Sequence, residues 1–480
     1  MKLAILALAL TAAAPTDRDW SAALRQDARA LHDDAAANHP GPHNRLDPDF
    51  AKRNDAGLAL ALKRAGAVHD FAGYWYAMKA YVAGFEDGHM GFGTTGDAPT
   101  FDTRWPGFLT GFDSADVQRV VSRDDAAPIP LSARLVSCDG KAAGALAADN
   151  VGAFEGRWFL KSRHVWRGGE LFVDRGNPFI TRPATCVFEV AGKRQTISLT
   201  WRPIAPDALG SRLAAASQVT HPPIEARTLA DGTRWFGLGD FNGDPASEGG
   251  RKLPGLIAAM KADRAALVAA PAIVLDLRGN NGGSSDWSRQ IAAVLWGEQR
   301  FATLGIDSDS VEWRASEANI TSLSATREQR KAILSPEALA WFDRTIAGMT
   351  AAHARGEALW RDTEDQEPAV PGDPPLPPHG PVYFITDAGC GSACLDAADL
   401  WRALGAIQIG QETSADTLYM DVRQDVLPSG VARLSVPMKV YRGRKRGSNV
   451  PLDPVHPFPG DLRDTAALEA WIATLPERRR

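Results

Sequence analysis

The strongest constraint on the fold is an alternation of buried strand-like runs and helical runs that starts after Pro206. The runs AIVLDLRG (272–279) and PVYFITD (381–387) are apolar over most of their length, and helical runs such as SRQIAAVLW and LDAADLWRAL follow them. Apolar strands that alternate with helices are typical of α/β domains, whose parallel sheets are covered on both faces. Residues 206–480 are therefore expected to form an α/β core with a mostly parallel sheet.

Two regions of different pattern precede this core, and one long stretch interrupts it. Residues 17–100 carry Ala, Leu and Asp at helical spacing and predict a small helical domain. Residues 104–205 contain short β-rich runs between Gly, Asp and Asn turns and predict a β domain. The insertion 300–380 joins a charged helical segment to a proline-rich stretch, and loops of this length are usually lids, binding segments or tethers.

Composition excludes several classes of protein. The 480 residues are too many for one hydrophobic core, and 44% hydrophobic residues indicate a chain that folds. The formal net charge of -5 argues against a surface that binds a phosphate backbone, so nucleic acid is not an expected partner.

The N-terminal segment is typical of an export signal. Lys2 precedes the apolar run LAILALALTAAA, which is too short to span a membrane. The small residues at 12–14 offer a cleavage site after Ala13, so residues 1–13 are predicted to be a signal peptide; a buried N-terminal helix is the alternative. The mature protein is then expected to be periplasmic or secreted, without stable insertion in the membrane.

Export permits disulfides among the four cysteines, Cys138, Cys186, Cys390 and Cys394. Four cysteines allow three connectivities, of which Cys138–Cys186 with Cys390–Cys394 is the most local. A zinc site is poorly supported because two neighbouring thiols make an incomplete ligand set, so no metal is expected. A catalytic thiol at Cys390 or Cys394 remains an alternative.

The segment AIVLDLRGNNGG ends a buried strand in a glycine-rich turn that contains Gly282 and Gly283. Glycines at the carboxyl end of a parallel strand let backbone N–H groups stabilise an anion or oxyanion. A phosphate loop is excluded because no Gly-Lys-Ser/Thr follows, whereas a simple glycine turn remains the alternative.

Ser392 lies where a second strand turns into a helix. A serine there can cap the helix, which this segment alone favours, or it can be an exposed nucleophile near the positive end of the helix dipole. His89, on the glycine turn of GFEDGHMGFG, is the best candidate for a general base, although a histidine bonded to a backbone carbonyl is the alternative. His39 and His43 have the pattern of helix termination around prolines, and no catalytic role is assigned to them.

In order along the chain, DGH, LDLRGNNGG, GSAC and IGQETSADT resemble the motifs of the tail-specific, C-terminal processing and tricorn-core serine peptidases. The resemblance covers most of the chain. It implies a crotonase-like (ClpP-like) core, preceded by a small helical domain and a PDZ-like β domain, in which ARLVSCDGKAAGAL is similar to a PDZ segment.

The resemblance also implies roles for individual residues. Ser392 matches the nucleophile, and its own N–H or that of Ala393, with the amide of Gly282 or Gly283, matches the oxyanion hole. His89 matches the histidine base of the tricorn branch.

The chain departs from the C-terminal processing branch at the position of its lysine base. Counting from Thr413, that position holds Asp416, which cannot act as the same kind of base. Asp416 is instead the expected acid that orients His89, with Glu412 and Asp453 as less favoured candidates.

The predicted function is a serine-type endopeptidase that cleaves peptides or unfolded proteins without a metal or organic cofactor. The alternative is an inactive member of the family that binds a peptide or an apolar ligand. A third hypothesis, an acyl-CoA enzyme of the crotonase type, is disfavoured by the export signal.

Overall fold

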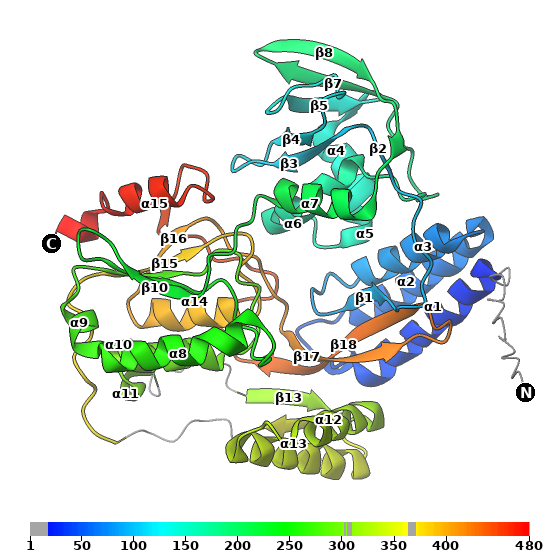
Figure 1. Cartoon of the computed structure of the whole chain (residues 1–480). Coiled ribbons are helices and arrows are strands. Elements are labelled where there is room, and N and C mark those ends of the chain that lie inside the picture. The colour runs from blue at the N-terminus through cyan, green and yellow to red at the C-terminus, as the bar shows by residue number, and fades with distance from the viewer. Residues whose placement is uncertain (1–17, 302–303, 305–309, 363–370, 480) are drawn as a thin grey trace, which may run out of the picture.

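The computed structural model describes residues 18–301, 304, 310–362 and 371–479 (Figure 1). The predicted signal peptide, residues 1–13, lies outside these residues. The described chain is a mixed α/β protein with a helical N-terminal region and several sheets, as the sequence predicts. Within the described ranges, no helix is both long and apolar enough to cross a membrane.

The N-terminal region is a bundle of three helices. They are α1 (Trp20–Asn38), α2 (Phe50–Arg64) and α3 (Phe71–Ala83). Asp19 and Asp70 cap α1 and α3 by accepting hydrogen bonds from backbone amides in the first turn. The short turn η1 (Gly41–His43) follows α1, and the strand β1 (Gly91–Thr94) follows α3.

The central sheet has the order β10-β11-β12-β15-β16-β19. Its strands from β11 to β19 are parallel, and β10 is antiparallel at one edge. Their bounds are β10 Glu225–Thr228, β11 Arg234–Gly237, β12 Ile273–Asp276, β15 Val382–Thr386, β16 Ile407–Gly410 and β19 His456–Pro457. The mostly parallel core that the alternating pattern predicts is therefore present.

Helices cover both faces of this sheet, as Figure 1 shows. Ile273 and Leu275 pack on one helical layer, and Val274 between them faces the other. This two-sided burial explains the continuous apolar run of β12. The first layer contains α8 (Glu248–Ala262), α9 (Arg264–Ala269), α10 (Asp286–Trp296) and α14 (Ala393–Ala403), and the second contains α15 (Thr465–Ile472). The short helix α11 (Glu298–Phe301) follows α10.

The predicted β domain contains an antiparallel sheet of order β3-β4-β5-β7-β8, with β6 paired to β5. In Figure 1 it lies above the helical region and the core. Its strands are β3 Phe108–Phe112, β4 Gln118–Arg123, β5 Arg134–Cys138, β6 Lys141–Ala142, β7 Thr185–Val190 and β8 Lys193–Ser198. A second, two-stranded sheet pairs β2 (Arg104–Trp105) with β9 (Arg202–Pro203). The helices packed with these sheets are α4 Ala143–Ala147, α5 Ala153–Glu155, α6 Lys161–Arg167 and α7 Pro206–Ser217. Because Leu209 and Ala216 of α7 are in the same hydrophobic cluster as the strands, residues 104–218 are called the β region below.

The 300–380 insertion adds secondary structure to a further sheet. Its strands β13 (Ser310–Arg314) and β14 (Leu359–Asp362) pair with each other, and β13 also pairs with β18 (Ala432–Arg442). Strand β18 in turn pairs with β1 and β17 (Tyr419–Val426). The insertion therefore shares a sheet with N-terminal and C-terminal segments, and its helices α12 (Glu317–Arg330) and α13 (Pro336–Ala354) pack on it.

Replacing Trp313 in β13 by Ala should destabilise the protein by about 3–5 kcal/mol, because a large side chain that is 1% exposed leaves a cavity. Urea unfolding of the whole chain measures this loss. The matched control is Ile333→Ala in the same insertion, which should have little effect because Ile333 is 67% exposed. Equal losses for the two variants would contradict the packing of the insertion on β18.

Candidate functional site

Two loops that follow neighbouring parallel strands form the centre of the candidate site. Strands β12 and β15 are paired in parallel, so their carboxyl ends lie at the same edge of the sheet. The carboxylate of Asp387, directly after β15, accepts hydrogen bonds from the Gly279 amide at 2.9 and 3.0 Å and from the Gly389 amide at 2.8 Å. A Cβ on Gly389 would lie 2.6 Å from Gly279 Cα, so this approach requires glycine.

Asp387 is a buried acid without a salt bridge among the described residues. Burial raises its pKa from the ordinary value of 3.8 to about 6, although the hydrogen bonds from Gly279 and Gly389 oppose the shift. The carboxyl group that joins the two loops therefore titrates well above the usual range of an aspartate.

Ser392 has an unusual backbone conformation at the start of α14. Its φ is 53° and its ψ is -124°, a region that residues other than glycine rarely adopt and that costs about 1–3 kcal/mol. Its side chain makes no capping hydrogen bond to the helix, so the capping role is not realised. A serine on a strained strand-to-helix turn is the arrangement of a nucleophile elbow.

Backbone hydrogen bonds hold this turn in place. The Ser392 amide donates to Asp416 Oδ2 at 2.8 Å, and the Leu395 amide donates to the Ser392 carbonyl at 2.8 Å. The Gly391 amide donates to the carbonyl of Asn280 in the glycine loop at 3.3 Å. Hydrogen bonds to the helix, to the glycine loop and to Asp416 thus hold the strained conformation of Ser392.

The four cysteines form two disulfides, Cys138–Cys186 and Cys390–Cys394. The first joins β5 to β7 in the β region. The second spans the turn on either side of Ser392, and both of its cysteines are fully buried. Since neither cysteine next to Ser392 has a free thiol, the thiol-nucleophile alternative does not hold in this structure.

The predicted oxyanion amides are not equivalent. The Gly282 amide donates to Asn280 Oδ1 at 2.9 Å, so it is used within its own loop, and of the two alternatives that the sequence leaves open this geometry favours Gly283. Gly282 is needed for space, because a Cβ there would lie 2.6 Å from Ser392 Cβ. The amides of Gly283 and Ala393 take part in none of the hydrogen bonds that join the described residues. Ala393 is in the first turn of α14, where amides have no partner within the helix.

The His89 turn reaches the same place from the N-terminal region. The His89 amide donates to Asp87 Oδ1 at 3.0 Å, and the Thr417 hydroxyl donates to the same oxygen at 2.8 Å. Thr417 directly follows Asp416, which binds the Ser392 amide. Residues 416–417 therefore connect the His89 turn to the Ser392 turn across more than 300 residues of sequence.

Asp416 and Asp87 are both buried, yet their pKa values move in opposite directions. Burial raises the pKa of Asp416, and the positive charge of His89 only partly offsets it. Burial alone would also raise the pKa of Asp87, but contacts with the His39 ring and the charge of His89 outweigh it and lower that pKa. The site thus contains one strongly acidic carboxyl and one weakly acidic carboxyl.

His89 does not reach Ser392 or Asp416, its predicted partners, within hydrogen-bonding distance. Among the described residues, His89 makes no ion pair with Asp416 within 4.0 Å and no hydrogen bond with Ser392. Its Nδ1 lies 3.9 Å from Asp87 Oδ1 and is buried without a hydrogen-bond partner. Asp416 contacts the Ser392 amide instead, so its role in orienting His89 stays a prediction.

Arg157 of the β region was missed by the sequence reasoning. Its guanidinium donates to the Ala415 carbonyl at 2.5 Å, and the charges of Asp87 and Asp416 act on it. Burial lowers the pKa of Arg157, and the two carboxylates oppose that shift. No motif marks this residue, because it lies in a connection between two short helices and far from its partners in sequence.

The less favoured acids lie in other surroundings. Glu412 pairs with Lys161 at 3.5 Å, and Asp453 is exposed. Within the described part of the chain, no group of three or more His, Cys, Asp or Glu side chains is placed to hold a metal ion.

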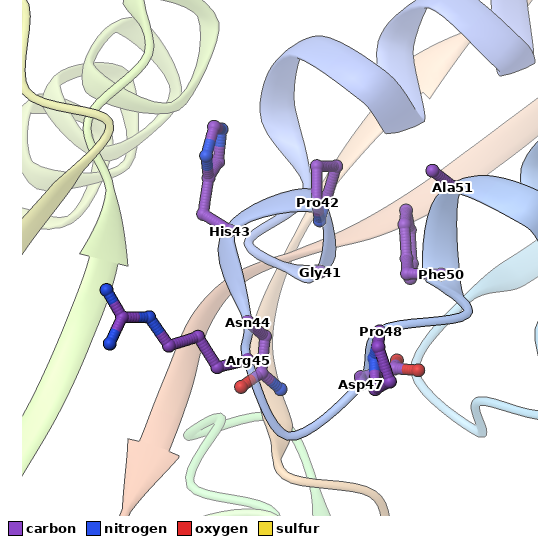
Figure 2. Close-up of a pocket in the computed structure, with 9 residues that line it drawn as sticks. All are labelled: Gly41, Pro42, His43, Asn44, Arg45, Asp47, Pro48, Phe50 and Ala51. Carbon is purple, nitrogen blue, oxygen red and sulfur yellow. The ribbon is translucent and has the colours of Figure 1, made fainter.

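Two cavities of the structure differ in their relation to these elements. One of about 350 Å³ is lined by nine residues between 41 and 51, shown in Figure 2, and contains none of the predicted site residues. Another of about 260 Å³ lies between the β region and the core, where Phe112 and Gln218 face Asp387 and Gln411. The second cavity is therefore next to the loop that carries Ser392.

No family model matches the chain, and no curated protein matches it. Among solved structures, mature CPAF gives a TM-score of 0.61 at 12% identity, over 94% of this chain and 96% of that chain. CPAF complexed with lactacystin gives 0.60 at 12% identity, over 94% and 97%. The photosystem II D1 C-terminal processing protease covers 92% and 93% at 13% identity, with a TM-score of 0.32, which is too low to support an argument. The chain shares the fold of CPAF.

Asp387→Asn tests the buried acid through the pH dependence of stability. Because folding raises the pKa of Asp387, the folded state binds this proton more tightly, and the stability that it adds is lost as pH rises from about 4 to about 6. The free energy of unfolding of the wild type, minus that of Asp387→Asn, should therefore fall as pH rises across this window and stay constant above it. Urea unfolding at a series of pH values measures the difference.

Asp461 in the same cavity is the control, because the hydrogen bond from Arg463 lowers its pKa. The stability that this acid adds is lost only as pH falls below its ordinary range, so the difference for Asp461→Asn should stay constant from pH 4 to 6. The same slope for both variants would refute the assignment to Asp387.

Proposed function

We propose that the protein is a serine-type peptidase with Ser392 as nucleophile and His89 as general base. The observation that carries the proposal is the positive φ of Ser392 at a strand-to-helix turn, since strained backbone of this kind clusters at functional sites. The fold shared with CPAF and the motifs that resemble those of tail-specific peptidases support the same proposal.

In the proposed reaction, His89 removes the proton of Ser392 Oγ as this oxygen attacks a peptide carbonyl carbon. The carbonyl electron pair moves onto oxygen, and the amides of Gly283 and Ala393 would donate hydrogen bonds to that oxyanion. When the intermediate collapses, the C–N bond breaks and His89 gives its proton to the leaving amine. Water then hydrolyses the acyl-enzyme by the same steps.

Two charged residues would assist this chemistry. Asp416 would stabilise the imidazolium by its negative charge, which already acts on His89 in the structure. Arg157 would balance the charge of Asp87 and Asp416 when the site closes around a substrate. Gly282 would keep the glycine loop close enough to Ser392 for the Gly283 amide to reach the reacting carbonyl.

The proposed substrate class rests on the ClpP-like core and the PDZ-like β domain that the sequence resemblance implies. A ClpP-like core would hold an extended peptide across the Ser392 turn, and the β region would bind a further segment by strand addition if it is PDZ-like. Peptides and unfolded proteins are the substrates that such an arrangement would accept. With the predicted signal peptide, the enzyme would work in the periplasm or outside the cell.

A binding protein without activity is the second candidate. It is favoured by the missing hydrogen bond between Ser392 and His89 and by the use of the Ser392 amide by Asp416. Catalytic hydrogen bonds are often long in proteins without substrate and tighten in the complex, so this geometry is compatible with an enzyme. Chemical reactivity of Ser392 separates the two candidates.

Ser392→Ala should abolish peptide cleavage and labelling by a fluorophosphonate, and His89→Ala should lower both rates by about 10²–10⁴-fold because proton transfer is lost. The rates are measured on the mature protein with an unfolded protein substrate. His43→Ala is the control, since His43 is an exposed histidine of the same region. Labelling that survives in Ser392→Ala, or is absent from the wild type, would contradict the proposed nucleophile.

The disulfide next to Ser392 should hold the turn in its reactive form. Cys390→Ala combined with Cys394→Ala is expected to lower the labelling rate by about 10- to 100-fold, because small displacements of a nucleophile are costly. The matched control removes Cys138 and Cys186 together, which should leave the rate near that of the wild type. Equal rates in the two double variants would show that the nearby disulfide does not position Ser392.

A further inference from the structure

His39 is a fully buried histidine that the proposed mechanism does not use. Its backbone amide caps α1 by donating to the Ala35 carbonyl at 3.3 Å, which fits the predicted role in helix termination. Its ring has different surroundings: it stacks on Phe50 with ring centroids 4.4 Å apart and meets Tyr419 edge-on at 4.5 Å. Helix termination accounts for the backbone of His39 and leaves the placement of the ring unexplained.

The neighbours of the ring define where its proton lies. The Gly41 amide donates to His39 Nδ1 at 2.8 Å, so Nδ1 accepts and the neutral ring carries its proton on Nε2. Figure 2 shows the turn that presents this amide, with Phe50 beside Gly41. The Nε2 atom faces Asp87 Oδ2 at 3.6 Å, and both atoms are buried with no closer partner.

Both oxygens of Asp87 have a close neighbour, but only Oδ1 is hydrogen-bonded. Oδ1 accepts from the Thr417 hydroxyl and from the His89 amide, and Oδ2 faces the His39 ring. Because Asp87 binds the backbone of His89 directly, a shift of this carboxylate shifts the His89 ring. A buried carboxylate moves easily only if one of these neighbours is lost.

We propose that His39 is a positioning residue, whose Nε2–H fixes the Asp87 carboxylate and, through it, places His89 for proton transfer with Ser392. This inference rests on the proposed function, because it assigns His39 to the same proton-transfer step. It differs from the triad that the sequence resemblance implies, since His39 touches neither the substrate nor the reacting atoms.

Two conservative variants separate the two nitrogens of the ring. In His39→Gln the side-chain amide can reach Asp87 from the position of Nε2, and the acceptor for Gly41 is lost. In His39→Asn the amide oxygen lies near the position of Nδ1 and can accept from Gly41, but it leaves Asp87 without a donor. A positioning role through Asp87 therefore predicts that Gln rescues function better than Asn.

The experiment measures kcat and KM for peptide cleavage and the rate of fluorophosphonate labelling of Ser392. We expect His39→Asn to lower kcat and the labelling rate by about 10- to 100-fold with KM nearly unchanged, and His39→Gln to stay within about threefold of the wild type. Full activity in His39→Asn would overturn the inference. The reverse order, with Asn active and Gln inactive, would overturn it as well, because it would assign the effect to the Gly41 turn.

A second pair of variants covers the case in which His39 variants do not fold. Thr417→Val removes the hydroxyl on Asp87 Oδ1, and Thr417→Ser keeps it. If Asp87 anchors His89, Val should lower kcat and the labelling rate while Ser preserves them, and equal rates for the two would overturn the inference. Failure of the proposed function looks different: the wild type itself would be unlabelled, and the inference would fall with it.

Discussion

The hydrogen bonds from Gly279 and Gly389 to the Asp387 carboxylate join the two loops on which the candidate site depends. Parallel pairing brings the ends of β12 and β15 together, but it does not set the path of the loops beyond them. Asp387 sets that path, and its burial is the cost, as its raised pKa shows. The close approach of Gly282 to Ser392 then follows from the loops being joined at their start.

The remaining parts of the site come from regions far apart in the sequence, and buried charge holds them together. Asp416 binds the Ser392 turn, Asp87 binds the His89 turn, and the charges of both carboxylates act on Arg157. A buried carboxylate is expensive unless it is hydrogen-bonded or paired. The lowered pKa of Asp87 shows that its charge favours the assembled arrangement, whereas the raised pKa of Asp416 shows that its hydrogen bond to the Ser392 turn only partly offsets its burial. The helical region, the β region and the core each supply one of these groups.

Because the parts of the site come from distant regions of the sequence, only some of them could be predicted from it. Strand β12, the glycine loop and the turn at Ser392 are encoded by local patterns of apolar residues, glycines and a strand-to-helix junction. Arg157 and the ring of His39 carry no local signal, because their roles come from partners in other regions. The choice between the Gly282 and Gly283 amides stays open in the sequence for a related reason: spacing alone does not show which of two adjacent amides turns inward.

Strand β13 of the insertion pairs with β18, which is far from it in the sequence. This pairing links the insertion to the candidate site. Strand β18 pairs with β1, which begins two residues after His89, at Gly91 opposite Ser435. The same strand pairs with β13 of the insertion at its other end, where Ser310 is opposite Arg442. The position of His89 therefore depends on a strand that the insertion helps to stabilise. The insertion, whose length in the sequence is typical of a lid, a binding segment or a tether, is in this fold part of the support of the proposed general base.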